Sequence, residues 1–254
     1  MLKDIQKASM WKRISAYIFD FIILSIVVVG IAFILSSVLG YAGYSDRLED
    51  YYEKYEAEYG VSLNITEEEY NKYSEEQKAK FDEAMKALTS DNEVSYTYTM
   101  LINLTLIIIS IGVLVGYMIT EFVLPICFKN GQTLGKRIFG IGVMRYDSVK
   151  INNITLFVRT VLGKYTIETM VPILILIMIY FGQIGIVGTI IIGLLLILQI
   201  AMIASTKTNS AIHDLLANTV TVDIHSQMIF DSEEDLIAFK KRVHAEAAAN
   251  AEYK

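Results

Sequence analysis

The chain contains apolar runs long enough to cross a lipid bilayer, and these runs restrict the folds open to it. A helix needs about 20 apolar residues to span the hydrocarbon core, and the first run, residues 12–39, exceeds that length. Of the 254 residues, 54% are hydrophobic, and the mean hydropathy is +0.43. The sequence therefore predicts an all-α integral membrane protein.

Basic residues precede the first run, as they do in a secretory signal. The run is too long for the apolar part of a signal peptide and has no convincing cleavage site, so we interpret it as an uncleaved span. Further spans are predicted at 99–128, 169–181 and 186–204, which gives four. The polar and apolar mixture over 154–169 is typical of a helix lying at the membrane interface.

The third and fourth spans are separated by a predicted tight turn at residues 182–185. A single helix over 169–204 would need more than about 50 Å of hydrocarbon, whereas roughly 30 Å is available. Two spans are therefore favoured over one long helix.

The predicted spans carry acidic side chains. Asp20 follows Arg13 by seven residues, so the two lie on one helix face, with Asp20 roughly 10 Å deeper. A carboxylate at that depth costs on the order of 2.5 to 3.5 kcal/mol and should have a partner. In the second span, Pro125 removes the N–H that would bond the carbonyl of Glu121. Glu121 could thus bind a cation, or a neighbouring hydroxyl or water could satisfy its carbonyl.

An acidic segment, residues 46–93, separates the first two spans. A helix is predicted over 47–59, ending at Gly60, and a capping box of Thr66 with Glu69 predicts a second helix to about residue 88. Tyrosines line one side of the first helix. They either hold the two helices together as a hairpin or form a surface for a partner.

The segment after the second span is rich in lysine and arginine. Alternating residues and a polar turn over 138–153 predict a short β-hairpin, which a strand at 219–224 could join. The glycine spacing fits no phosphate-binding loop. From Asp231 the tail reads as an amphipathic helix capped by Ser232 with Asp235. The single cysteine, Cys127, excludes an intramolecular disulfide.

Charge predicts the orientation. Lysine and arginine cluster before the first span, between the second and third, and after the fourth, so both termini and the basic loop are expected in the cytoplasm and the acidic segment outside. We divide the chain into four parts: the N-terminus with the first span, 1–45; the acidic insertion, 46–96; the remaining membrane domain, 97–225; and a cytoplasmic helical tail, 226–254. Asp20 and Glu121 would then lie at similar depth and could meet.

Three residues, Arg13, Asp20 and Asp214, resemble the arginine and two aspartates after which the RDD family of bacterial membrane proteins is named. The segment GQTLGKRIFGIGVMR is the most specific part of this resemblance, and Glu121 lies where members often carry an acidic residue. The residues of this cytoplasmic motif are Gln132, Thr133, Gly135, Lys136 and Arg137, with His213 at the same face. The resemblance implies a protein of the bacterial cell membrane and a transporter, with cation/proton exchange suggested for some members.

Two functions remain open on these residues. In a transporter, Asp20 and Glu121 would form the exchanging pair, because two close carboxylates repel and a cation competes with protons for them. Arg13 would set the electrostatic potential around this pair, and Asp214 would guide ions toward it. In a non-transporting protein, the same charges form a structural ion-pair network, and the insertion or tail recruits partners.

The expected partners are the lipid bilayer, a monovalent cation or proton, and a second copy of the chain, but no nucleic acid. No cofactor or metal is predicted, and no enzyme activity, because the sequence shows no nucleophile elbow and its three histidines have no metal-ligand spacing.

Overall fold

The computed structural model describes residues 5–128, 130–180 and 184–252, and it confirms an all-α architecture with one small two-stranded sheet. The chain forms two compact units. The first unit joins Met1–Val28 to Val113–Lys254, and the second is Val29–Gly112. Because the first unit combines both ends of the chain, contacts far apart in sequence build its interior.

Four helices in the described part of the chain are long and apolar enough to cross a membrane, as predicted. They are Met10–Val38, Asn92–Phe128, Asn153–Tyr180 and Gly185–Ser205. Residues 154–169, predicted as an interfacial helix, are helical and form the first part of the third long helix. Most of the turn predicted at 182–185, and Phe181 at the end of the predicted third span, lie outside the described residues.

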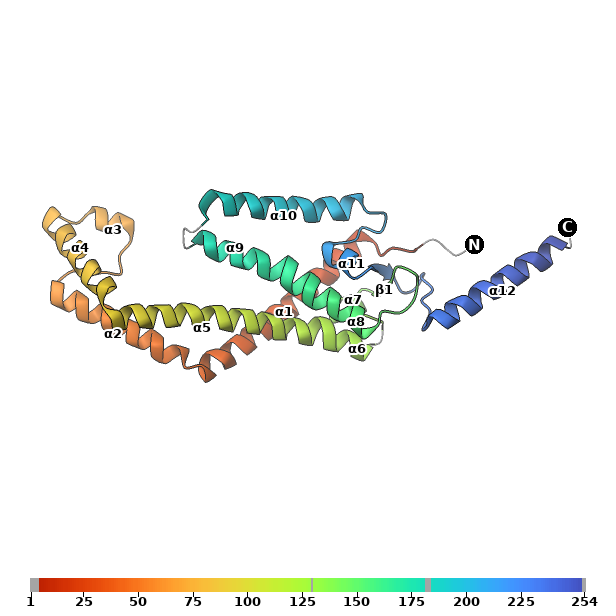
Figure 1. Cartoon of the computed structure of the whole chain (residues 1–254), viewed down its shortest axis with the longest axis horizontal. Helices are drawn as coiled ribbons and strands as arrows, with labels where there is room; N and C mark the ends of the chain where they lie inside the picture. The colour runs from red at the N-terminus through yellow and green to blue at the C-terminus, as the bar shows by residue number, and fades with distance from the viewer. Residues whose placement is uncertain (1–4, 129, 181–183, 253–254) are drawn as a thin grey trace. The chain divides into compact units, whose positions relative to one another are not determined.

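The second and third long helices both contain π-helical turns. The second consists of α5 (Asn92–Tyr117), η1 (Met118–Val123) and α6 (Leu124–Phe128). The third consists of α8 (Asn153–Phe157), η2 (Val158–Met170) and α9 (Val171–Tyr180), and Figure 1 shows α9 beside α10 (Gly185–Ser205). Such π turns occur often at functional sites.

The proline in the second long helix explains the short π stretch η1. In this stretch the backbone N–H of Leu124 donates to the carbonyl of Ile119, five residues back. The hydroxyl of Thr160, on η2, donates to the carbonyl of Glu121 at 3.0 Å. A neighbouring hydroxyl thus satisfies the carbonyl that Pro125 leaves free, which was one of the two outcomes expected from the sequence.

The second unit contains a helical segment that we call the tyrosine hairpin, formed by α2 (Tyr41–Tyr59), α3 (Glu67–Asn71) and α4 (Glu75–Ser90). Helix α2 ends at Gly60, whose φ of 65° is left-handed, and Thr66 caps α3 as predicted. The prediction of one helix from Thr66 to about residue 88 is wrong. Ser74 and Gln77 form a second capping box, which starts α4 as a separate helix.

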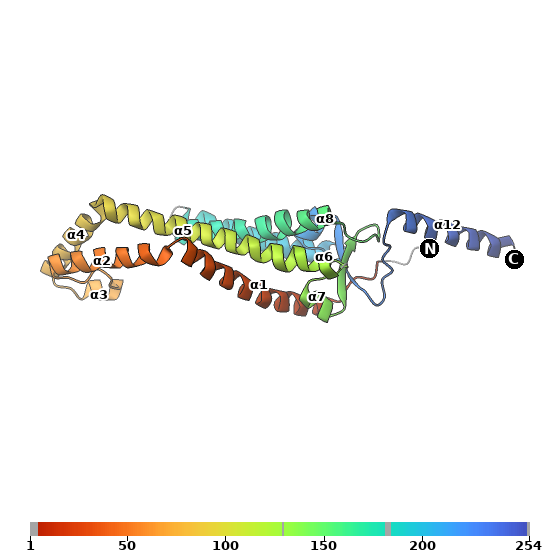
Figure 2. The ribbon, with the colours of Figure 1, turned by 90° about the horizontal axis from the view of Figure 1, so that it is seen from below.

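The tyrosine hairpin has its own apolar core. Tyr55 on α2 is buried with Ala84 and Leu88 of α4, and Figure 2 shows α2 beside α4. Tyr51, Tyr52 and Tyr59 pack against the same cluster while remaining partly exposed. The tyrosines therefore hold the hairpin together, the first of the two roles considered for them.

The small sheet pairs β1 (Ile141–Arg145) with β2 (Thr219–Asp223), antiparallel, with Val143 opposite Thr221. The predicted local hairpin is reduced to one bridge between Met144 and Lys150. The strand near the C-terminus is thus the main partner of β1. Helix α12 (Glu233–Glu252) follows, and Ser232 accepts from the N–H of Asp235 as predicted.

Candidate functional site: a buried charge network

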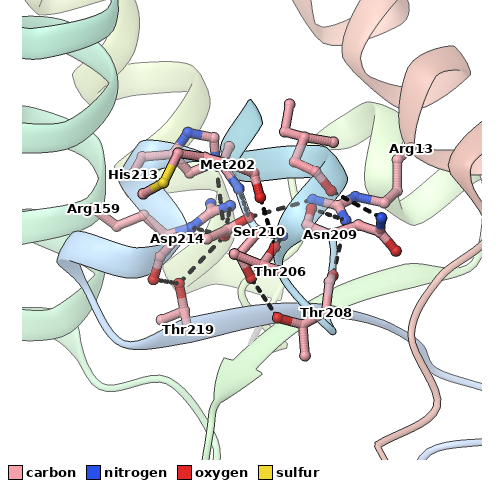
Figure 3. Close-up of polar contacts among 12 residues, drawn as sticks. Arg13, Arg159, Met202, Thr206, Thr208, Asn209, Ser210, His213, Asp214 and Thr219 are labelled. Atoms are coloured by element: carbon pink, nitrogen blue, oxygen red, sulfur yellow. Dashed lines mark hydrogen bonds and ion pairs between the residues drawn. The ribbon is translucent and has the colours of Figure 1, made fainter. Parts of the chain in front are cut away.

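Asp214 lies between two arginines at the start of the short helix α11 (Ile212–Leu216). Its Oδ1 accepts from Arg159 Nη2 at 2.8 Å and from Nε at 3.2 Å, and its Oδ2 accepts from Arg13 Nη2 at 3.3 Å. Figure 3 shows Arg13 and Arg159 reaching Asp214 from opposite sides. The sequence left open whether Arg13 pairs with Asp20 or with Asp214, and the structure pairs it with Asp214.

The Asp214 carboxylate is fully buried. Burial by itself would raise its pKa, but Arg159, His213 and Arg13 outweigh burial and hold the pKa of Asp214 well below its usual value. Arg13 Nη1 donates to the carbonyls of Thr208 and Asn209. The expectation that Asp214 guides ions toward the site does not fit this arrangement, because the carboxylate is enclosed and doubly paired.

Glu121 lies between two lysines. Its Oε1 accepts from Lys164 Nζ at 2.5 Å, and its Oε2 lies 3.6 Å from Lys136 Nζ. Among the described residues, neither Oε2 nor Lys136 Nζ makes a hydrogen bond, although both atoms are buried. Burial lowers the pKa of Lys136 to about 8, against the opposing effect of the Glu121 carboxylate. This ion pair is therefore incompletely satisfied, in contrast to the pairs around Asp214.

Asp20 is held by the N-terminus of the short helix α7 (Leu134–Ile138). It accepts from the hydroxyl of Thr133 and, at 2.7 Å, from the backbone N–H of Gly135. A Cβ on Gly135 would lie 2.4 Å from the carbonyl oxygen of Ala16, so only glycine permits this close approach of α7 to α1. Asp20 and Glu121 thus have different partners and do not form the directly interacting pair expected from the sequence.

His213 links the network to the third and fourth long helices. Its Nδ1 lies 2.8 Å from Glu168 Oε2, and its backbone N–H donates to Glu168 Oε1 at 3.0 Å. The amide of Gln199, on α10, also donates to Glu168 Oε1. Burial is the largest influence on His213 and lowers its pKa, which favours the neutral imidazole.

A cavity of about 730 Å³ connects these groups. Its polar lining includes Asp20, Glu121 and Lys136, and its apolar lining comes mainly from side chains of α1 and α10. The two carboxylates predicted to lie at the same depth therefore share one cavity even though they do not touch. A volume of this size lies within the roughly 300 to 1,000 Å³ of ligand pockets.

Some predicted residues have other roles. Gln132 donates to the carbonyl of Ile141 at 2.9 Å and fixes the loop before β1. Thr133 also caps α7 by accepting from the N–H of Lys136. Arg137 is exposed and lies 4.5 Å from the ring centroid of Phe128, so it does not face the cavity.

Sequence reasoning missed three members of the network: Arg159, Lys164 and Glu168. All three lie on η2, in the stretch that the sequence assigned to the membrane interface. The available signal was their charge, because charged side chains on a helix that enters the membrane need partners, as argued for Asp20.

Within the described ranges, no group of three histidine, cysteine, aspartate or glutamate residues is placed to hold a metal ion. Any cation at this site would therefore rely mainly on Glu121 or Asp20, with hydroxyls, carbonyls or water as further ligands.

The sequence model of the RDD family matches residues 7–218, which includes every residue of the network. No curated protein and no solved structure matches the chain.

Proposed function

The chain belongs to the RDD family, and on that premise we propose that this membrane protein exchanges a monovalent cation for protons at Glu121. The observation that carries the proposal is the buried ion pair between Glu121 Oε2 and Lys136 Nζ, 3.6 Å apart and without a hydrogen bond at either atom within the described chain. A buried charged group without hydrogen bonds is costly. Of the ion pairs in the network, the pair of Glu121 and Lys136 is therefore the one in which a cation most readily replaces the lysine charge.

The exchange follows from charge balance. When Lys136 loses its proton, Glu121 keeps Lys164 but loses one compensating charge, and a monovalent cation can then take the place of the Lys136 proton. When Lys136 is protonated again, its charge repels the cation. One cation is thus exchanged for one proton, because the cation and the protonated Lys136 compete for the same carboxylate.

The pH dependence has a defined sign. Bound cation favours neutral Lys136, so cation affinity should rise as the pH increases through the pKa of Lys136, about 8, and fall below it. The cavity of about 730 Å³ reaches both Glu121 and Lys136 and supplies a route for the ion.

We extend the proposal to orientation, with both termini in the cytoplasm of a bacterial cell. It is supported by lysine and arginine beside the termini and between the second and third long helices. In a Cys127→Ser background, cysteines introduced at Ser90 and Ser232 should differ in intact cells. Only the first should react with a membrane-impermeant reagent, and labelling of the second alone would reverse the orientation.

The proposal is tested by flux in proteoliposomes. Purified protein is reconstituted with an internal pH indicator, and sodium, potassium or lithium is added outside at several pH values. The native protein should move protons in response to at least one cation. Glu121→Gln should abolish this response by removing the carboxylate that binds the cation, and Lys136→Gln should abolish it by removing the group that carries the exchanged proton.

The matched control is Lys150→Gln, because Lys150 is also a lysine in an ion pair, 2.8 Å from Asp231, but lies outside the cavity. Its flux should equal that of the native protein. If Glu121→Gln is folded and flux is unchanged, or if no cation moves protons, the exchange proposal is wrong.

A second candidate function is a non-transporting membrane protein with a structural charge network. The observation in its favour is the complete pairing of Asp214, which has two arginine partners and no unsatisfied side-chain oxygen in the described structure. Native protein without flux, together with loss of folding when network charges are removed, would support this alternative.

A further inference from the structure

We infer that the cavity beside the charge network binds one membrane phospholipid whose headgroup carries a phosphate and a primary ammonium. The inference goes beyond ion exchange, because it concerns the apolar part of the cavity and is read out by binding alone. It rests on the length of the cavity, the exposure of its rim and the polar groups that line it.

The cavity has the length of one leaflet. Its lining positions on α10 extend from Ile192 to Ala204, about 18 Å along the helix axis, and those on α1 extend from Met10 to Asp20, about 15 Å. Half of a hydrocarbon core of about 30 Å is about 15 Å. Asp20 is the last lining residue on α1, and Gln199 lies about 10 Å from Ile192 along α10, so an acyl chain beyond these polar groups would lie along α10 from Gln199 to Ile192.

The rim of the cavity consists of exposed apolar side chains on membrane-spanning helices. Leu196 and Ile200 on α10 are 60% and 67% exposed, and Ile14 on α1 is 43% exposed. In a bilayer these side chains face lipid. A lipid can therefore enter sideways, without crossing water.

The polar lining of the cavity calls for a ligand that offers both a hydrogen-bond acceptor and a donor. Lys136 Nζ donates no hydrogen bond and Gln199 Oε1 accepts none within the described residues, and both residues line the cavity. A phosphate oxygen can accept from Lys136, whose ammonium has three N–H donors. A primary ammonium can donate to Gln199 Oε1, whereas a quaternary choline has no N–H to donate.

Charge balance favours a lipid without net charge. Among the described residues, the network combines four basic side chains with four carboxylates: Arg13, Lys136, Arg159 and Lys164 with Asp20, Glu121, Glu168 and Asp214. His213 lies against Glu168 and Asp214, and its lowered pKa keeps it neutral near pH 7. An anionic headgroup would add an unbalanced charge to a site of low dielectric, and a zwitterionic headgroup would not.

The experiment is native mass spectrometry of the full-length protein in detergent, titrated with three lipids that have identical dioleoyl chains. These are phosphatidylethanolamine, phosphatidylcholine and phosphatidylglycerol. We expect one ethanolamine lipid to bind at least about tenfold more tightly than either of the others, which corresponds to about 1.4 kcal/mol. Equal binding of all three, or tightest binding of the anionic lipid, would overturn the inference.

Two variants at adjacent positions of α10, which point about 100° apart, test the location. Leu196→Trp fills the cavity, whereas Ile197→Trp introduces the same side chain at a position that is 64% exposed and outside the cavity. The first should reduce ethanolamine-lipid binding at least about tenfold, and the second should leave it unchanged. Equal effects of the two variants would place the lipid elsewhere. Because neither variant alters Glu121 or Lys136, loss of lipid binding is distinguishable from loss of exchange.

Discussion

The tyrosine hairpin and the charge network place their ion pairs in opposite environments. In the hairpin, Lys80 pairs with Glu76, a side chain that is 80% exposed, whereas Arg159 and Asp214 of the network are 2% and 0% exposed. Exposed pairs contribute about 0 to 1 kcal/mol, but removing one member of a buried pair costs about 3 to 5 kcal/mol. The stability of the hairpin should therefore come from its apolar core and its helix caps. The stability of the charge network should come from its buried ion pairs.

The largest expected effect is that of Asp214→Asn. This change leaves Arg13 and Arg159 without their carboxylate, and we expect a loss of about 3 to 5 kcal/mol in the free energy of unfolding. Thermal unfolding of the purified protein in detergent measures the loss. Asp231→Asn is the control, because it makes the same change in an exposed ion pair with Lys150 and should have an effect below about 1 kcal/mol.

Asp214→Asn should also change how the stability of the protein depends on pH in acid. The pKa of Asp214 is lowered in the folded protein, so its stabilising effect is present above its unfolded-state value of about 3.9 and is lost as the pH falls below that value. Asp214→Asn should remove this part of the acid dependence. Equal stability of the two aspartate variants, or an unchanged acid profile, would contradict the contrast between the regions.

The next effect should come from the apolar core of the tyrosine hairpin. Leu88 is 2% exposed and packs with Tyr55 and Ala84. Leu88→Ala should destabilise the hairpin by about 3 kcal/mol, since buried Leu→Ala changes cost roughly 2 to 5 kcal/mol. Hydrogen exchange should accelerate in α2 and α4.

The control for this change is the exposed residue Ile237 on α12. Ile237→Ala should leave exchange in the hairpin unchanged. If Leu88→Ala accelerates exchange around Asp214 as strongly as in α2 and α4, the hairpin core does not act as a local unit.

The two regions also differ in how well the sequence predicts them. Gly60 and the pair Thr66 with Glu69 are local signals, and each has the predicted role because the interacting groups lie within four residues. The partners of Arg159 and Lys164 lie 55 and 43 residues away. No local pattern could identify Asp214 and Glu121 as those partners.

The family resemblance identified both Arg13 and Asp214 but not their contact. That contact forms because α11 brings Asp214 to Arg13, while α7 occupies Asp20 through Thr133 and Gly135. The error at the second hairpin helix had a different cause. The signal of Ser74 with Gln77 was local and readable, but the favourable helix composition around it concealed the break.

The smallest expected effect tests whether that second cap matters. Ser74 Oγ accepts from the N–H of Gln77 at 3.3 Å and starts α4, which contributes Ala84 and Leu88 to the core. Ser74→Ala should cost about 1 kcal/mol, the usual loss for such a cap. Hydrogen exchange of the backbone amides in α4 should accelerate about fivefold.

Thr66→Ala is the matched comparison, because Thr66 makes the same contact with the N–H of Glu69, also at 3.3 Å. It starts α3, whose five residues are all described and include none that is buried. Exchange in α4 should therefore stay at the native rate in this variant. Equal acceleration of α4 by both changes would mean that α3 and α4 unfold together, and that the break between them has no energetic consequence.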